Sequence, residues 1–161
     1  QGQQALKDGS LQTAQYSLSG AVAIQSAPFL ELLLARTEMA LGNPDKSLKL
    51  SLSVLKGDKS NSIACSLCAR SLYLMSDFGP AEKHWREALR LDPDNTEAAV
   101  WLKRCKKVTV AVKAARAAVY SRQFEEGVDL FTQALAADPD LVITVRKSEK
   151  EAREAGEEDK Q

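Results

Sequence analysis

One pattern of side-chain sizes recurs along this chain and limits what it can fold into. The pattern has four positions: a small residue, a bulky one four residues later, a second small one three residues after that, and proline a further five residues on. Two helices approach closely only where one offers a small side chain, and the bulky residue fills the space beside that contact. The recurrence therefore predicts a series of packed helix pairs. The complete copies are Ala81, Trp85, Ala88, Pro93 and Gly127, Phe131, Ala134, Pro139. A copy without proline is Ala14, Leu18, Ala21, Ser26, and a weaker copy, which keeps the spacing but not all of the sizes, is Ser47, Ser51, Val54, Lys59.

The prolines fall at the ends of the apolar-periodic segments and never inside them. Pro44 and Pro80 lie just inside the start of such a segment, where a missing N–H costs nothing. The most strand-like run, VTVAV at 108–112, continues directly into the helical KAARAAVY. We therefore expect an all-α chain built of helix–turn–helix pairs.

The spacing of equivalent positions gives the length of the repeating unit. Ala21 to Val54 is 33 residues and Val54 to Ala88 is 34. A 34-residue period with this order of small, bulky, small and proline resembles the tetratricopeptide repeat. The resemblance implies a right-handed superhelix, an α-solenoid of antiparallel helix pairs. It divides the chain into a partial repeat (1–27), repeats at 28–61 and 62–95, a repeat with an extended first helix (96–140), and a C-terminal helix with a frayed tail (141–161).

The spacing is irregular once, between the last two copies of the pattern. Ala88 to Ala134 is 46 residues, and the extra segment at 96–107 contains no helix breaker. We expect it to fuse with the next helix into one rod from about 95 to 121, roughly 40 Å long at 1.5 Å per residue. Asp94 and Glu97 have the spacing of a capping box at its start.

Charge and hydropathy exclude two classes of partner. The 161 residues contain 22 Lys and Arg against 22 Asp and Glu, so the chain lacks the positive excess on which nucleic-acid affinity depends. No apolar run approaches the roughly 20 residues of a membrane helix. We expect neither nucleic acid nor membrane as a partner. The first residue is Gln1, and we expect the chain to be part of a longer protein with any targeting signal outside it.

The residues capable of chemistry are few. Cys65 and Cys68 form a C-x-x-C, which could be a redox pair or half a zinc site, or could pack in the core of a helix pair. Only Cys105 and His84 could add ligands, and they do not form the second closely spaced pair typical of a zinc site, so we expect no metal and no cofactor. His84 has no nucleophile or Gly-rich loop beside it, so we expect no enzyme activity. Three thiols suit a reducing compartment such as the cytoplasm.

A longer stretch supports a narrower resemblance. ARSLYLMSDFGPAEKHWREALRLDPDNTEAAVWLKRCKKV followed by AARAAVYSRQFEEGVDLFTQAL is similar to the repeat region of the DnaJ homolog subfamily C member 7 co-chaperones, over about residues 28–140. Such motifs are also shared with plant tetratricopeptide thioredoxin-like proteins and other scaffolds. The resemblance implies a scaffold that holds chaperones or client proteins in a concave groove. The alternative is a structural subunit of a larger assembly.

Two features of that family are missing from this sequence. The His-Pro-Asp triplet of a J-domain does not occur, since His84 is followed by Trp85 and Arg86. The two-carboxylate clamp for acidic tails is also incomplete, with Val112 in place of its lysine and Arg116 in place of its asparagine. Apolar residues stand at further positions where the clamp is polar, namely Leu33, Ile63 and Leu67.

Three arginines suggest another way of holding an acidic peptide. Arg36, Arg70 and Arg116 fall at the same site of three first helices once the extra twelve residues are discounted, with Tyr73 and Tyr120 nearby. Each guanidinium can hold a carboxylate in a bidentate pair. We hypothesise that they bind an extended acidic segment, such as one from a heat-shock chaperone. In the alternative, each arginine pairs with an internal acid, with Glu38 as one candidate.

Overall fold

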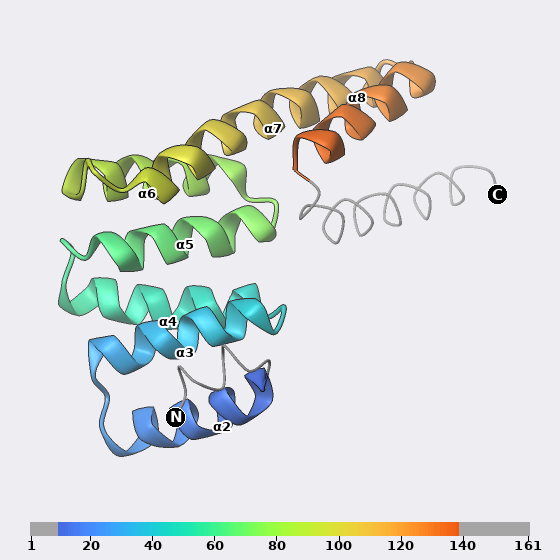
Figure 1. The fold of residues 1–161 in the computed structure, drawn as a ribbon. Helices are drawn as coiled ribbons and strands as arrows, with labels where there is room; N and C mark the ends of the chain where they lie inside the picture. The colour runs from blue at the N-terminus through green and yellow to red at the C-terminus, as the bar shows by residue number, and fades with distance from the viewer. Residues whose placement is uncertain (1–9, 139–161) are drawn as a thin grey trace. The chain divides into compact units, whose positions relative to one another are not determined.

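The structure is a computed structural model that describes residues 10–138, and within that range it contains seven α-helices and no strand (Figure 1). The strand-like run at 108–112 lies inside a helix, which confirms the all-α prediction. The predicted C-terminal helix and frayed tail lie outside the described residues. The helices are α2 (Leu11–Ile24), α3 (Pro28–Ala40), α4 (Pro44–Gly57), α5 (Ser62–Leu74), α6 (Phe78–Leu91), α7 (Thr96–Tyr120) and α8 (Phe124–Ala137).

The chain divides into two compact units, residues 1–102 and 103–161. α7 begins in the first unit and continues into the second as one helix of 25 residues. This confirms the continuous helix predicted for 95–121. It forms because no Gly or Pro interrupts the twelve additional residues.

In the first unit, each helix packs against the next in antiparallel pairs (Figure 1). The small residues of the recurring pattern lie at these contacts: Ala81 and Ala88 of α6 are completely buried, as is Ser47 of α4. Trp85 is 1% exposed, so the bulky member of the pattern fills the space between its neighbours as predicted. The size pattern therefore identified the helix contacts correctly.

Two residues after the end of each of the helices α3, α5 and α7 lies a residue with left-handed backbone geometry. Gly42, Ser76 and Arg122 have φ of 80°, 62° and 60°. They lie 34 and 46 residues apart, in phase with the repeats. Glycine adopts this conformation without strain, whereas a side chain at Ser76 or Arg122 costs energy there.

Asparagine, rather than aspartate, caps two of the first helices. Asn61 Oδ1 accepts a hydrogen bond from the backbone N–H of Ala64 at 3.0 Å, and Asn95 Oδ1 accepts one from that of Ala98 at 2.9 Å. The predicted capping box at Asp94 was therefore wrong by one residue. Because α7 begins at Thr96, Asn95 is the residue whose side chain reaches the third N–H of the helix.

In the second unit, α8 packs closely on the last turns of α7. Gly127 provides the contact, since a Cβ there would lie 2.9 Å from Val119 Cγ2. At the end of α8, the buried Asp138 pairs with Arg104 Nη1 at 3.5 Å. The α7–α8 hairpin is thus fixed at both of its ends.

Candidate peptide-binding surface

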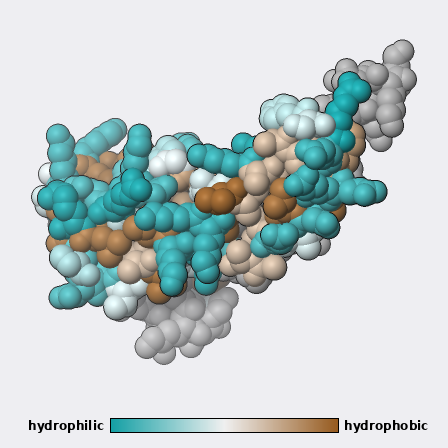
Figure 2. Space-filling model, turned by 90° about the horizontal axis from the view of Figure 1, so that it is seen from above, coloured by the Kyte–Doolittle hydropathy of each residue, from teal (hydrophilic) through white to brown (hydrophobic). Residues whose placement is uncertain are grey.

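First helices in the first unit expose both charged and apolar side chains at equivalent positions. Phe29 of α3 and Ile63 of α5 lie 34 residues apart and are 63% and 56% exposed. Arg36 and Arg70 are separated by the same 34 residues, and Glu97 of α7 follows Ile63 at that spacing. We call these five residues the first-helix surface. On the face that it draws, Figure 2 shows hydrophobic side chains exposed between hydrophilic ones.

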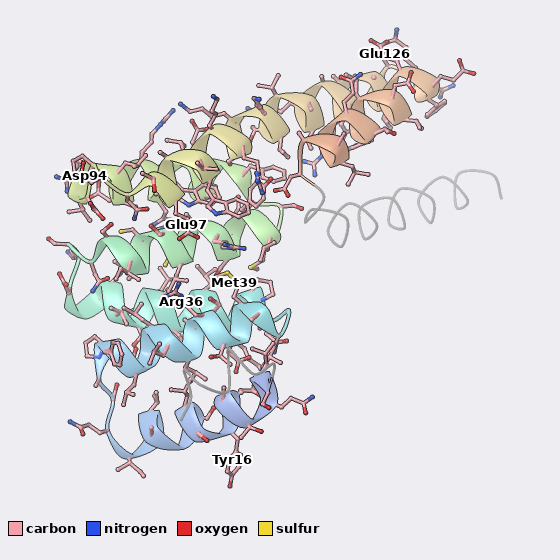
Figure 3. The ribbon with its side chains drawn as sticks, in the orientation of Figure 1. Tyr16, Arg36, Met39, Asp94, Glu97 and Glu126 are labelled. Carbon is pink, nitrogen blue, oxygen red and sulfur yellow. The ribbon has the colours of Figure 1, made fainter. Side chains whose placement is uncertain are left out.

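Arg36 is the cation of this surface that is open to a ligand. It is exposed on α3, and no hydrogen bond or ion pair joins it to another of the described residues 10–138. Figure 3 shows Arg36 and Met39 on the side of α3 that faces α5. An exposed guanidinium with its donors free can receive a carboxylate in a bidentate pair.

Arg70 is held in place by α7. Its Nη1 lies 3.4 Å from Glu97 Oε1, and its Cζ lies 4.4 Å from the ring centroid of Trp101. The ion pair is exposed and contributes little, but stacking on the indole fixes the guanidinium plane. Its Nε is buried without a hydrogen-bond partner. Arg70 is therefore pre-positioned and only partly satisfied by the protein.

Tyr73 does not lie on the exposed surface where the sequence placed it. It is completely buried, with its ring 5.4 Å from Phe78, 5.6 Å from Trp85 and 5.9 Å from Trp101 between centroids, each pair edge to face. Trp101 also stacks on Trp85 at 6.2 Å. The expected ligand contact by Tyr73 is corrected to a core role, because α7 covers this end of α5 with an indole. Trp101 thus packs against the preceding helix, α6.

Glu38 is not the partner of an arginine. It is 4% exposed and accepts hydrogen bonds from Gln15 Nε2 at 2.7 Å and Asn43 Nδ2 at 2.9 Å, with Lys46 Nζ 3.9 Å away. It thus joins α2, the α3–α4 turn and α4. Internal pairing does occur for Arg70, but with Glu97. The sequence did not indicate this pair, because Glu97 lies three residues after Asp94, a spacing that suggested a helix cap.

The remaining candidate residues lie in the second unit. Arg116 is exposed on α7, and Tyr120 is 87% exposed. Val112, which stands where the clamp has a lysine, is 6% exposed, and Leu67 in the first unit is 8% exposed. Burial of these two apolar residues excludes them from binding a carboxylate.

The cysteines are core residues. Cys65, Cys68 and Cys105 are buried, with at most 2% exposure. Burial raises the pKa of Cys68 to about 12, with Cys65 nearby as a further cause, and burial also raises the pKa of Cys65. A thiol that resists ionisation is a poor nucleophile and a poor metal ligand. Within residues 10–138, no three His, Cys, Asp or Glu side chains are grouped to hold a metal ion.

His84 is the remaining residue that the sequence offered for chemistry. Burial lowers the pKa of His84, while the nearby Glu87 acts in the opposite direction. None of the helices in the described part of the chain combines the length and the apolar character needed to cross a membrane.

Comparison with known proteins supports the repeat assignment. No model of a known protein family matches the sequence. The solved tetratricopeptide domain of P58(IPK) superposes on 91% of this chain with a TM-score of 0.71 at 20% identity, covering 41% of that chain. The chain carries tetratricopeptide repeats. Its fold is the all-α tetratricopeptide solenoid that the sequence predicted.

Two further proteins are similar to this chain, one in sequence and one in fold. The DnaJ homolog subfamily C member 7 homolog of Dictyostelium discoideum is 30% identical over 112 residues, which is 70% of this chain. The chain spans about a fifth of that relative, 21% of its length. The first tetratricopeptide domain of Spaghetti (RPAP3), solved with the HSP90 peptide SRMEEVD, matches 68% of this chain and 87% of its own, with a TM-score of 0.64 at 18% identity. The resemblance to the repeat region of subfamily C member 7 is thus confirmed.

Proposed function

We propose that this chain is the non-catalytic binding scaffold of a cytoplasmic co-chaperone and that its first-helix surface binds an extended acidic peptide of a chaperone. The observation that carries the proposal is the exposed Arg36, which has no ion-pair or hydrogen-bond partner among residues 10–138 and lies one repeat away from Arg70, fixed on Trp101. Two guanidiniums at repeat spacing suit carboxylates along an extended chain.

The apolar members of the surface define a second requirement of the peptide. Phe29 and Ile63 are exposed one repeat apart, at the helix starts preceding the two arginines. A segment that combines carboxylates with an apolar side chain satisfies both kinds of group. The peptide SRMEEVD, which RPAP3 binds, has this composition. Relatives of this chain are co-chaperones, which supports a chaperone as the source of the segment.

Peptide binding tests the proposal with the full chain. Fluorescence anisotropy would be measured with labelled SRMEEVD and with SRMQQVN, in which the acidic residues are amides. We expect the acidic peptide alone to bind, and Arg36→Glu to weaken it at least tenfold. Lys49→Glu, the same charge change on an exposed site of α4, is the matched control and should change affinity less than twofold.

The salt dependence of binding completes the test. Raising the salt concentration should weaken binding steeply, because exposed charges are screened over about 10 Å at 0.1 M. An affinity for the acidic peptide that changes neither with Arg36→Glu nor with salt concentration would contradict the proposal.

The alternative function is a structural subunit whose first-helix surface is covered by another protein. Exposure of Phe29 and Ile63 favours it in part, because a covered interface is more apolar than a peptide site. A stable complex that withstands high salt and is lost in a Phe29→Asp, Ile63→Asp variant would support this alternative.

A further inference from the structure

One face of α7 in the second unit is open where the same face of α5 is buried. Subtracting the 46-residue spacing aligns Val110 with Ala64 and Ala114 with Cys68. Ala64 and Cys68 are completely buried, whereas Val110 is 70% exposed and Ala114 is exposed. The same repeat position is therefore core in α5 and surface in α7.

The difference arises from a neighbouring helix. α4 covers this face of α5: Val54 of α4 belongs to one core cluster with Ala64, and Ser51 of α4 is a hydrogen-bonding neighbour of the Cys68 thiol. In the described part of the second unit, residues 103–138, the helices are α7 and α8 alone, and no further helix covers the equivalent face.

An open groove marks the uncovered face. It has a volume of about 490 Å³ and is lined by residues of both helices of the hairpin, including Lys106, Lys107, Val110, Ala111, Ala114 and Leu130. The alanines allow the backbone of another helix to approach closely, and Val110 and Leu130 offer apolar contacts. The groove thus fits a helix with one apolar face.

The charge around the groove selects the occupant. Residues 103–122 contain seven Lys and Arg and no Asp or Glu, although the whole chain is neutral. Of these, Arg104 is paired with Asp138, while Lys106 and Lys107 line the groove itself. An acidic helix is attracted to such a surface, and a second copy of the same basic face is repelled by it.

We propose that the groove between α7 and α8 binds an acidic amphipathic helix of a partner protein, which docks on α7 as α4 docks on α5. The site is separate from the first-helix surface and does not depend on the proposed acidic-peptide binding there. Its basic groups would pair with acidic residues flanking the apolar face of the incoming helix.

α4 itself supplies the probe. A peptide of residues 44–57 carrying Lys46→Glu, Lys49→Glu and Lys56→Glu keeps the face that covers α5 but becomes acidic. Because a free 14-residue helix is marginal in water, a side-chain cross-link on its outer face would hold it helical. The matched control is the same cross-linked peptide with its lysines.

Binding of both peptides to the full chain would be measured by fluorescence anisotropy. We expect the acidic peptide to bind at least tenfold more tightly than the lysine peptide. The double variant Lys106→Glu, Lys107→Glu should weaken it at least tenfold, as should Ala114→Trp, which fills the groove. The control Lys49→Glu, Lys56→Glu in the protein and the first-helix variant Arg36→Glu should leave its affinity within twofold.

The proposal would be overturned if the two peptides bound with equal affinity, or if the double variant Lys106→Glu, Lys107→Glu bound the acidic peptide as tightly as the unchanged protein. Ala114 and both lysines are exposed, so these variants are expected to fold, with circular dichroism as the check. A photo-reactive residue at position 114 identifies the occupant. Cross-linking to residues 139–161 of the same chain, or to a second copy, would also overturn assignment to a partner helix.

Discussion

Replacing Trp85 with alanine tests the packing on which the first-helix surface depends. The side chain is 1% exposed, and its ring lies 5.6 Å from Tyr73 and 6.2 Å from Trp101 between centroids. A large-to-small change in a site like this costs about 3–5 kcal/mol through lost burial and the remaining cavity. Each lost aromatic pair adds about 0.5–1.5 kcal/mol, which places Trp85→Ala at the upper end of that range.

The measurement is urea unfolding followed by circular dichroism and by tryptophan fluorescence. The chain has two tryptophans, both in this cluster, so Trp101 remains as a reporter of the first unit in the variant. Lys83→Ala on an exposed site of the same helix is the control and should change the free energy of unfolding by less than about 0.5 kcal/mol. A loss below about 1 kcal/mol for Trp85→Ala would show that the cluster does not hold α5, α6 and α7 together.

Three further changes probe other parts of the fold. Ala88→Leu should destabilise the first unit by about 1–3 kcal/mol in urea unfolding, because this completely buried residue marks a close helix contact without room for a larger side chain. Lys106→Pro should cost about 3 kcal/mol or more and lower the helical circular dichroism signal, whereas Lys106→Ala should not, since only proline interrupts α7. Ser76→Gly should stabilise the protein by up to about 1 kcal/mol in thermal unfolding because φ is 62° there, while Ser53→Gly inside α4 should lower stability by a similar amount.

The fold was predictable because helices approach closely where their side chains are small, so the spacing of small residues marks the helix contacts. Ala81 and Ala88 could be assigned from sequence alone, and the missing breaker before Val108 was enough to predict one long α7. The cap of α7 was harder, because DPDN offers several oxygen-bearing side chains within four residues. Only the position of the first helical turn selects Asn95 among them.

The candidate site was less predictable because repeat position does not fix exposure. Arg36 and Arg70 occupy the same position of successive repeats, yet only Arg70 meets an indole and a carboxylate. Tyr73 is buried because Trp101 of the next helix lies against it. These contacts depend on the extra residues at the start of α7, which a repeat pattern derived from the other helix pairs does not describe.

The most direct measurement of the central claim is the NMR response of the arginine side chains to SRMEEVD. The Nε–Hε signals of Arg36 and Arg70 report on the first-helix surface, and those of Arg86 and Arg90, which pair with glutamates on α6, are the reference. We expect Arg36 and Arg70 to shift on titration with the acidic peptide while Arg86 and Arg90 keep their positions. Shifts confined to Arg86 and Arg90, or no shift at all at saturating peptide, would contradict an acidic-peptide site on α3 and α5.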